Sequence, residues 1–231
     1  MDDVIEDFET RVLELDAYLK VLDRLEKPDV ALMNRSTQRE VRVFGDDSFK
    51  VMKATVFLLL YNIVEATVPS AFREVYRHLE SEGKAFADVR EELRKLWVGQ
   101  GFRILDFDSA ARRNYRELTE DMTEAVINGT ILSLSEDELP ISGNLNAKEI
   151  RRVCHLHGID VATHFRARGG VELETVKLHR NHLGHGNVTF SDCGRQFTVS
   201  DLERIKRECV VFVRSVLKNI KKYVENAEYA A

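Results

Sequence analysis

Apolar residues recur at helical spacing along most of the chain. Between residues 2 and 25 they lie mostly three or four positions apart, which predicts an amphipathic helix that ends before Pro28. The apolar positions of this helix are Val4, Ile5, Phe8, Val12, Leu15, Leu19 and Leu22. The helical pattern returns at Ser48 and continues to about Gly83. Its middle, Phe57 to Thr67, is apolar on nearly all sides, so we expect this helix to be central, with a kink or a break at Pro69.

Shorter elements are predicted in the middle of the chain. Helices are expected from Ala87 to Val98 and from Arg112 to Ile127. Residues 99–111 are expected to form a loop, and the acidic stretch from Ser133 to Gly143 a connector. Charged and apolar residues alternate from Arg39 to Phe44, which suggests one short strand.

Capping signals frame the last three predicted helices. Asn146 to Glu149 has the pattern of a capping box and opens a helix that stops at Gly158. A second helix runs from Val171 to Asn187, where Gly-Asn marks its end. Ser200 to Glu203 is another capping box and opens a final helix to about Ala227, whose apolar stripe we expect to be core. With three prolines in the chain, the pattern predicts one all-α domain with an elaborated middle region.

Composition is typical of a soluble globular protein, with 44% hydrophobic and 32% charged residues. The first seven residues are acidic where a signal peptide would be basic, and the most apolar run, Ala54 to Tyr61, is too short to span a bilayer. We therefore expect a cytoplasmic protein with no membrane partner. The cysteines, Cys154, Cys193 and Cys209, are odd in number and widely spaced, which argues against a disulfide framework and against a zinc site.

Positive charge is concentrated in one segment of an acidic chain. The net charge is −5, but ten Lys or Arg and four Asp or Glu lie between Lys177 and Lys222, a local balance of +6 that leaves −11 for the remainder. Such a segment would suit an anionic partner such as RNA. A solvated helix face has the same composition, and charge alone favours that simpler interpretation.

The stretch from His179 to Asn187, His-Arg-Asn-His-Leu-Gly-His-Gly-Asn, carries the candidate chemistry. Arg180 and His185 are five positions apart near the end of a predicted helix, which is roughly 140° around its axis, so they flank one groove. Histidine exchanges protons near neutral pH, and arginine grips phosphate through paired N–H groups. Asn181, four residues before His185, is placed to hold its ring by a hydrogen bond.

Arg-Asn-x-x-x-His, followed by Gly and placed before a long final helix, resembles the spaced Arg…His signature of the HEPN superfamily. More narrowly, the chain resembles the small stand-alone MAE-like HEPN proteins encoded beside restriction–modification and toxin–antitoxin genes. The stretches that carry the resemblance are Leu58–Glu65, Ser142–Ile150 and Arg180–Leu202. It thus extends from about residue 48 to the end of a single domain, while residues 1–45 form an N-terminal helix and connector.

The resemblance implies an all-α HEPN bundle and a metal-independent endoribonuclease, without a cofactor, whose site is shared by the two protomers of a homodimer. RNA is the implied substrate, in a defence or toxin–antitoxin setting, and an antitoxin or restriction–modification protein is the implied further partner. We assign proton transfer to His185 and stabilisation of the phosphate charge to Arg180. Asn181 would orient His185 or contact the phosphate. The other supporting residues are His182, Glu65 and Tyr61, the last two lining the cleft from the central helix.

One departure limits the resemblance. Some HEPN proteins that pair with a nucleotidyltransferase carry a tyrosine two residues after the motif histidine, and this chain has Asn187 there. Control by nucleotidylation of a tyrosine is therefore not expected.

Other interpretations of the same residues stay open. His179, His182 and His185 could suggest a metal site, but steps of three spread the rings around a helix and no acid lies among them. Cys154, His155 and His157 also look like ligands, although one core cysteine and two surface rings are the simpler expectation. A non-catalytic HEPN module that binds nucleic acid or a partner protein is the alternative function, and a helical adaptor with no nucleic-acid role is a third.

Overall fold

The described part of the chain is almost entirely helical. The computed structural model describes residues 1–27, 29, 30, 33–40, 46–107, 115–141 and 143–231, and for residues 103–107 the backbone alone. Within these ranges there are eight α-helices, two 3-10 helices and no strand. In chain order they are α1 (Asp2–Leu25), α2 (Asp46–Ser81), η1 (Phe86–Asp88), α3 (Glu91–Phe107), α4 (Tyr115–Ile127), α5 (Ala147–His157), η2 (Phe165–Gly170), α6 (Glu172–Gly184), α7 (Phe190–Arg195) and α8 (Val199–Glu225).

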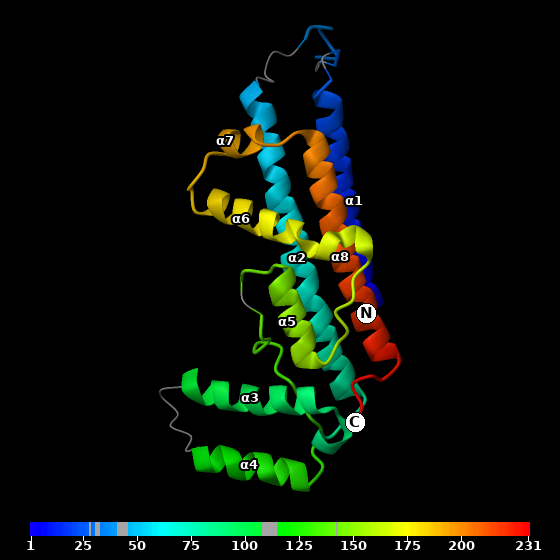
Figure 1. Ribbon diagram of the computed structural model, residues 1–231, viewed down its shortest axis with the longest axis vertical. Helices are drawn as coiled ribbons and strands as arrows, with labels where there is room; N and C mark the ends of the chain where they lie inside the picture. The colour runs from blue at the N-terminus through cyan, green and yellow to red at the C-terminus, as the bar shows by residue number, and fades with distance from the viewer. Residues whose placement is uncertain (28, 31–32, 41–45, 108–114, 142) are drawn as a thin grey trace.

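Three long helices, α1, α2 and α8, lie side by side along the length of the molecule (Figure 1). The stripe predicted on α8 is confirmed as core, since its seven members are at most 3% exposed. They are Leu202, Ile205, Cys209, Phe212, Val216, Ile220 and Tyr223. Five of the seven apolar positions predicted on α1 are buried as well. The helical period of the apolar residues therefore predicted the buried faces of α1 and α8, two of the three long helices around this core.

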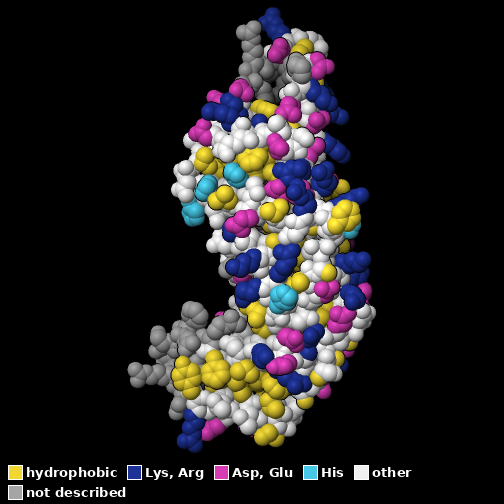
Figure 2. All heavy atoms as spheres, in the orientation of Figure 1, with side chains coloured by type: hydrophobic (Ala, Val, Ile, Leu, Met, Phe, Trp, Pro, Cys, Tyr) yellow, Lys and Arg dark blue, Asp and Glu magenta, His cyan; other side chains and the backbone are white. Residues whose placement is uncertain are grey.

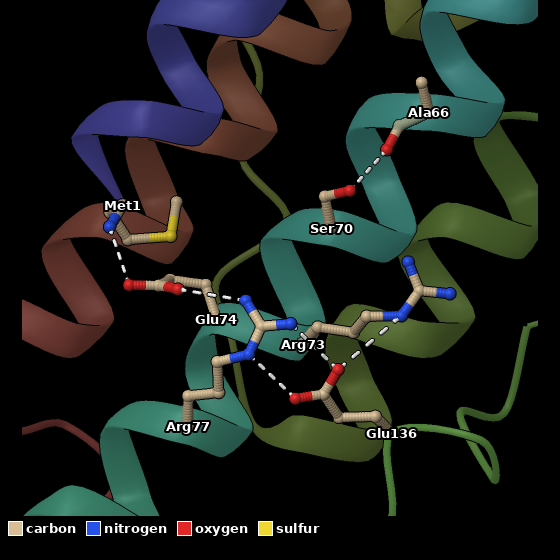
Figure 3. Close-up of polar contacts among 7 residues, drawn as sticks. All are labelled: Met1, Ala66, Ser70, Arg73, Glu74, Arg77 and Glu136. Atoms are coloured by element: carbon tan, nitrogen blue, oxygen red, sulfur yellow. Dashed lines mark hydrogen bonds and ion pairs between the residues drawn. The ribbon is translucent and has the colours of Figure 1, made fainter.

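Helix α2 is the central element of the fold, as its apolar middle predicts. It packs against α1, α6, α7 and α8. Of the kink or break expected at Pro69, the break does not occur, because α2 is continuous through this residue. In the same turn the Ser70 hydroxyl donates to the Ala66 carbonyl oxygen at 2.8 Å (Figure 3). By length and composition α2 alone, within the described residues, could cross a membrane. More than half of its apolar stretch is buried inside the protein, as in a core helix.

The acidic connector is fastened to the surface of α2 by ion pairs. Glu136 accepts two hydrogen bonds from the Arg77 guanidinium, at 2.8 and 3.0 Å, and lies 4.0 Å from the Nε of Arg73 (Figure 3). Glu74, on the next turn, accepts a hydrogen bond from the amino group of Met1 at 3.0 Å. The lower part of α2 thus holds both the connector and the start of α1 in place.

Helices α3 and α4 form a hairpin across one end of the bundle (Figure 1). The loop expected from residue 99 to 111 is wrong up to Phe107, because α3 continues to that residue, and residues 108–111 lie outside the described part. A Cβ on Gly101 would overlap the Cε of Met122, so the flexible end of this α4 side chain occupies the space beside the glycine.

Both ends of α5 and the start of α8 follow the capping signals, although the capping box of α8 lies two residues earlier than predicted. Asn146 caps α5, where its side chain accepts a hydrogen bond from the Glu149 amide, and Gly158 ends the helix with a left-handed φ of 70°. The capping box of α8 is formed by Thr198 and Asp201 and not by Ser200 and Glu203. Both pairs have the spacing that the box requires, and the earlier pair lies where the chain is still extended.

The predicted strand from Arg39 to Phe44 falls mostly outside the described residues. Glu40 forms an isolated antiparallel bridge with Met33.

The short helix α7 packs closely on the backbone of α2 near the N-terminal end of this central helix. A Cβ on Gly194 would collide with the carbonyl oxygen of Lys50, so α7 can lie there only because this residue has no side chain.

Candidate active site

The end of α6 determines where the two motif residues lie. The helix was predicted to reach Asn187 but ends at Gly184, so Arg180 is in its last turn and His185 is the residue that follows it. Gly186 is left-handed with φ 69°, and the Asn187 amide donates to the His182 carbonyl oxygen at 2.8 Å. These two features are those of a Schellman motif, as the Gly-Asn signal predicted. His185 is exposed, and histidine side chains gather over α6 in Figure 2.

Arg180 is held against the central helix by three side chains. Its guanidinium lies over the ring of Tyr61, with 4.5 Å between the guanidinium carbon and the ring centroid. One terminal nitrogen donates to both carboxylate oxygens of Glu65, at 3.1 and 3.3 Å, and the other donates to the Asn181 side-chain oxygen at 3.0 Å. The side chain is 33% exposed. Arg180 is therefore oriented and still reachable by a ligand from solvent.

Tyr61 ties this site to the connector before α5. Its hydroxyl donates to the Gly143 carbonyl oxygen and accepts from the Leu145 amide, each at 3.0 Å. Burial, followed by the charge of Glu65, raises the pKa of Tyr61 above its ordinary value of 10.0. The hydroxyl thus keeps its proton at neutral pH and acts as a fixed support beneath Arg180. Both candidates from the central helix, Glu65 and Tyr61, contact the motif arginine.

Asn181 has partners other than the one expected. Its side-chain oxygen accepts from Arg180, and its side-chain nitrogen donates to Asn144 Oδ1 at 3.1 Å. Its contact with His185 is through the backbone, where the His185 amide donates to the Asn181 carbonyl oxygen at 3.0 Å. The expectation that this amide holds the imidazole ring is therefore wrong in this conformation. Within the described residues, the His185 ring has no hydrogen bond or ion pair.

Asn144 is a site residue that the sequence did not single out. Asn144 belongs to the Ser142–Ile150 stretch, which is one of those that carry the resemblance. No rule of helical spacing, however, connects it to Asn181 on α6. The only local signal was a second asparagine, Asn146, two positions later. That residue also contacts α6, because its side-chain nitrogen donates to Glu174 at 2.6 Å. The connector thus joins α5 to the motif helix through two asparagines.

The histidine run divides into packing and surface residues. The His179 ring lies between Phe57 and Phe197, with centroid distances of 4.7 and 5.0 Å, and its Nδ1 is 3.5 Å from the Cys193 sulfur. Burial lowers the pKa of His179, and the neighbouring His182 adds to this shift. His182 meets His179 edge to face at 6.5 Å. Among the described residues, no three His, Cys, Asp or Glu side chains are grouped closely enough to hold a metal ion.

The second candidate histidine cluster contains one error of prediction. Cys154 is buried and His155 exposed, as expected, but His157 is 0% exposed. Its Nδ1–H donates to the Val153 carbonyl oxygen at 2.7 Å, which leaves Nε2 to accept from the Tyr76 hydroxyl at 2.9 Å. Burial lowers the pKa of His157 from 6.5 to about 4. The ring is thus a neutral core residue and not a surface one.

The basic segment from Lys177 to Lys222 is largely neutralised within the protein. Eight of its ten cations form ion pairs, and three of these pairs join α8 to the acidic residues of α1. The three pairs are Lys206–Asp16, Arg214–Glu9 and Lys221–Asp2. Little of the charge counted along the sequence is therefore left for an external polyanion, which agrees with the simpler interpretation of this segment.

Comparison with known proteins identifies the family of the chain. No curated protein and no solved structure was found to match the chain. The family model of MAE-like HEPN domains matches residues 1–229, which includes the N-terminal helix that added little to the resemblance. Because this match covers almost the whole chain, the protein belongs to the MAE-like HEPN family.

Proposed function

We propose that the protein is a metal-independent endoribonuclease whose active site is completed by a second copy of the chain. HEPN domains are known for ribonuclease activity in general. The observation that carries the proposal is the pairing, at one helix end, of an oriented arginine with an exposed histidine. Arg180 has its terminal nitrogens fixed by Glu65 and Asn181, while its Nε–H has no partner in the described part of the chain. That group is available to a phosphate oxygen.

The proposed reaction needs two proton transfers and one cation. A base removes the proton of the ribose 2′-hydroxyl, the O2′–P bond forms as the P–O5′ bond breaks, and an acid protonates the leaving 5′-oxygen. One imidazole cannot take and give a proton in the same step, so two copies of His185 supply the base and the acid. The Arg180 guanidinium stabilises the charge that grows on the non-bridging oxygens.

The surface of α6 supports a dimer that brings two motifs together. Val171 and Leu178 are 57% and 46% exposed, large values for apolar side chains. They precede His185 by fourteen and seven positions, and seven residues are close to two helical turns, so the three share one face. Covering this apolar face with a copy related by a twofold axis near the C-terminal end of α6 would set the two His185 rings beside each other.

The test begins with the purified wild-type protein, a labelled single-stranded RNA and excess EDTA. We expect cleavage that leaves 2′,3′-cyclic phosphate ends and continues in the chelator. Loss of activity in EDTA, with recovery on addition of a divalent metal, would overturn the metal-independent reaction. Failure of the wild type to cut any RNA would favour the non-catalytic binding module.

A mixing experiment tests the shared site. Arg180→Ala and His185→Ala are each expected to be inactive alone. When the two proteins are unfolded together and refolded, or coexpressed, part of the activity should return, because one protomer supplies the arginine and the other the histidine. Each variant at the same total concentration is the control. Recovery that does not exceed the controls, in samples shown to contain mixed dimers, contradicts the shared site.

A further inference from the structure

The most exposed large apolar side chain in the described part of the chain is Phe165, at the start of η2. It is 78% exposed, although burial of a phenyl ring is strongly favourable. Two groups that suit a nucleobase flank it. The His164 ring centroid is 4.5 Å from that of Phe165 at an angle of 31°, and the Arg166 guanidinium lies 5.7 Å from the same centroid. The three consecutive residues form an aromatic and cationic platform.

The platform is fixed to the body of the protein. The His164 amide donates to Ser215 Oγ on α8 at 3.2 Å, and the Arg166 amide donates to His164 Nδ1 at 3.2 Å. At the other end of η2, an Arg151 terminal nitrogen donates to the Gly169 carbonyl oxygen at 2.8 Å. Both ends of this short segment are thus tied down. An exposed ring on a rigid support loses little conformational entropy when a ligand stacks on it.

Unpaired positive charge surrounds the platform. Lys148 and Arg151 on α5, Arg166 on η2 and Lys218 on α8 form no ion pair with any described residue. Arg152 and Arg168, in the same region, are paired with Glu149 and Glu208. Residues 144–168 contain five Lys or Arg and two Asp or Glu. Figure 2 shows Lys and Arg side chains gathered over α5 and the adjoining η2.

Two hollows make room for an extended chain on this surface. One, of about 540 Å³, is lined by residues of α5 that include Lys148 and Arg151. The other, of about 480 Å³, lies between η2 and α8 and is lined by residues that include Arg166 and Lys218. The four cations that lack an acidic partner therefore line the hollows, together with Arg152 and Arg214, which are paired with Glu149 and Glu9.

The surface starts beside the candidate active site. Asn181, which binds Arg180, also contacts Asn144, two positions before the residue that caps α5. Lys148 is in the first turn of that helix and Arg151 in the next. A strand leaving the motif along α5 would therefore meet these cations in order before it reached the platform.

We propose that the α5–η2 surface, made of Lys148, Arg151, His164, Phe165, Arg166 and Lys218, binds single-stranded RNA, with one base stacked on Phe165. This inference rests on the proposed function, since it assumes that RNA is the ligand of the motif. A single strand fits because its bases are free to stack on a side chain, whereas those of a duplex are covered by their neighbours.

The first test is binding of a labelled 12-nucleotide single-stranded RNA, measured by fluorescence anisotropy on the His185→Ala background to prevent cleavage. Phe165→Ala should weaken binding roughly 5- to 100-fold, the range found for loss of one stacking side chain. Phe165→Tyr should bind nearly as well as the parent, because the ring is kept. The matched control is Ile127→Ala, which removes an apolar side chain that is 77% exposed on α4. Equal binding by Phe165→Ala and the control overturns the proposal.

The salt dependence tests the cations. Replacing Lys148 and Arg166 by alanine should reduce the slope of log affinity against log salt by about 1.4, since each phosphate contact to a single strand contributes about 0.7. An unchanged slope would show that these side chains do not contact phosphate. Binding of a blunt RNA duplex as tightly as the single strand would also count against the surface as proposed.

Cleavage assays separate this inference from the proposed function. If both are right, Phe165→Ala raises KM for the 12-nucleotide RNA at least fivefold more than KM for a dinucleotide that contains only the scissile linkage. Binding that depends on Phe165 without any wild-type cleavage supports the surface and overturns the nuclease. Cleavage of both substrates that is insensitive to Phe165→Ala supports the nuclease and overturns the surface. A change of oligomeric state in Phe165→Ala would instead identify an interface between copies.

Discussion

A His-Gly pair lies at the C-terminal end of both α5 and α6, and the two histidines have opposite environments. His157 is the last residue of α5 and His185 the first residue after α6, and the glycine that follows each is left-handed, at φ 70° for Gly158 and 69° for Gly186. His157 is nevertheless fully buried, between Phe72 and Tyr76 of α2, while His185 is exposed. The two local sequences are thus alike, and the place of each histidine relative to its helix end and to α2 decides whether its ring is buried or exposed.

The two helices also contact α2 in different ways. α5 places the histidine itself against α2 and bonds its Nε2 to the Tyr76 hydroxyl. α6 places the arginine five residues earlier against α2, on Glu65, and leaves the histidine beyond the helix end. A histidine next to a helix-ending glycine is therefore no evidence of function until the face that meets the core is known.

The largest expected effect concerns His185. His185→Ala should lower the rate of cleavage of a dinucleotide substrate by about 10²- to 10⁴-fold, the usual contribution of one acid–base group. Its midpoint of thermal unfolding should stay within a degree or two of wild type, because the ring is exposed. His155→Ala, which removes another exposed histidine in the last turn of a helix, is the matched control and should keep full activity. Similar rates for the two variants would remove His185 from the mechanism.

His157→Ala should show the reverse pattern. Removal of a fully buried ring leaves a cavity and takes away the partner of the Tyr76 hydroxyl, so we expect the free energy of unfolding to fall by roughly 2–4 kcal/mol. Denaturant titration measures the change. At a temperature where the variant stays folded, cleavage per folded molecule should match wild type. A stability loss below 1 kcal/mol would mean that the contact with Tyr76 contributes little.

The depressed pKa of His157 predicts sensitivity to acid. The unfolded ring titrates near 6.5 and the folded ring near 4, so below pH 6.5 protons bind the unfolded state first. The stabilisation is fully present above pH 6.5 and declines as the pH falls to about 4, with a total loss of about 3 kcal/mol.

A variant without the titrating ring isolates this effect. His157→Gln should be less stable than wild type at pH 8, and the difference should shrink steadily between pH 6.5 and 4. Denaturant titrations at each pH give the two curves. Parallel curves over this range would show that His157 has the same pKa in the folded and the unfolded state.

The smallest expected effect concerns the anchor of α6. Glu65→Gln keeps the shape of the side chain but removes the charge that faces Arg180. This pair is about one third exposed, so the loss of stability should be at most about 1 kcal/mol. We expect kcat to fall several-fold with little change in KM, because the guanidinium is less well oriented. Wild-type kcat in this variant would show that Asn181 and Tyr61 position Arg180 without Glu65.

Periodicity and capping residues predicted the elements well, and tertiary partners explain where they failed. The stripes of α1 and α8 and the caps at Asn146, Gly158 and Gly186 follow from local rules, and the structure confirms them. The loop predicted for residues 99–111 was wrong up to Phe107, where α3 continues and packs against α4. Pro69 was expected to kink or split α2, and the helix is not split.

In the candidate site, too, the sequence identified the residues of the motif and of the central helix but missed a partner from a distant segment. Arg180, Glu65 and Tyr61 were identified from sequence and lie in contact. The partner of Asn181 was missed because it comes from a connector 37 positions away, which no helical spacing could indicate. The partners of the basic segment were likewise not predictable from local spacing. The acids that neutralise α8 belong to α1, roughly two hundred positions earlier in the chain.

The missing side chain at position 194 has a consequence for how the protein tolerates substitution. α7 rests directly on the α2 backbone, and the adjoining Cys193 touches His179 in the helix that carries the motif. The spacing between α2 and the motif helix is therefore set in part by the glycine at position 194. A single methyl group there would push α7 away from α2. Sensitivity to substitution should therefore extend to a residue that has no proposed chemical role.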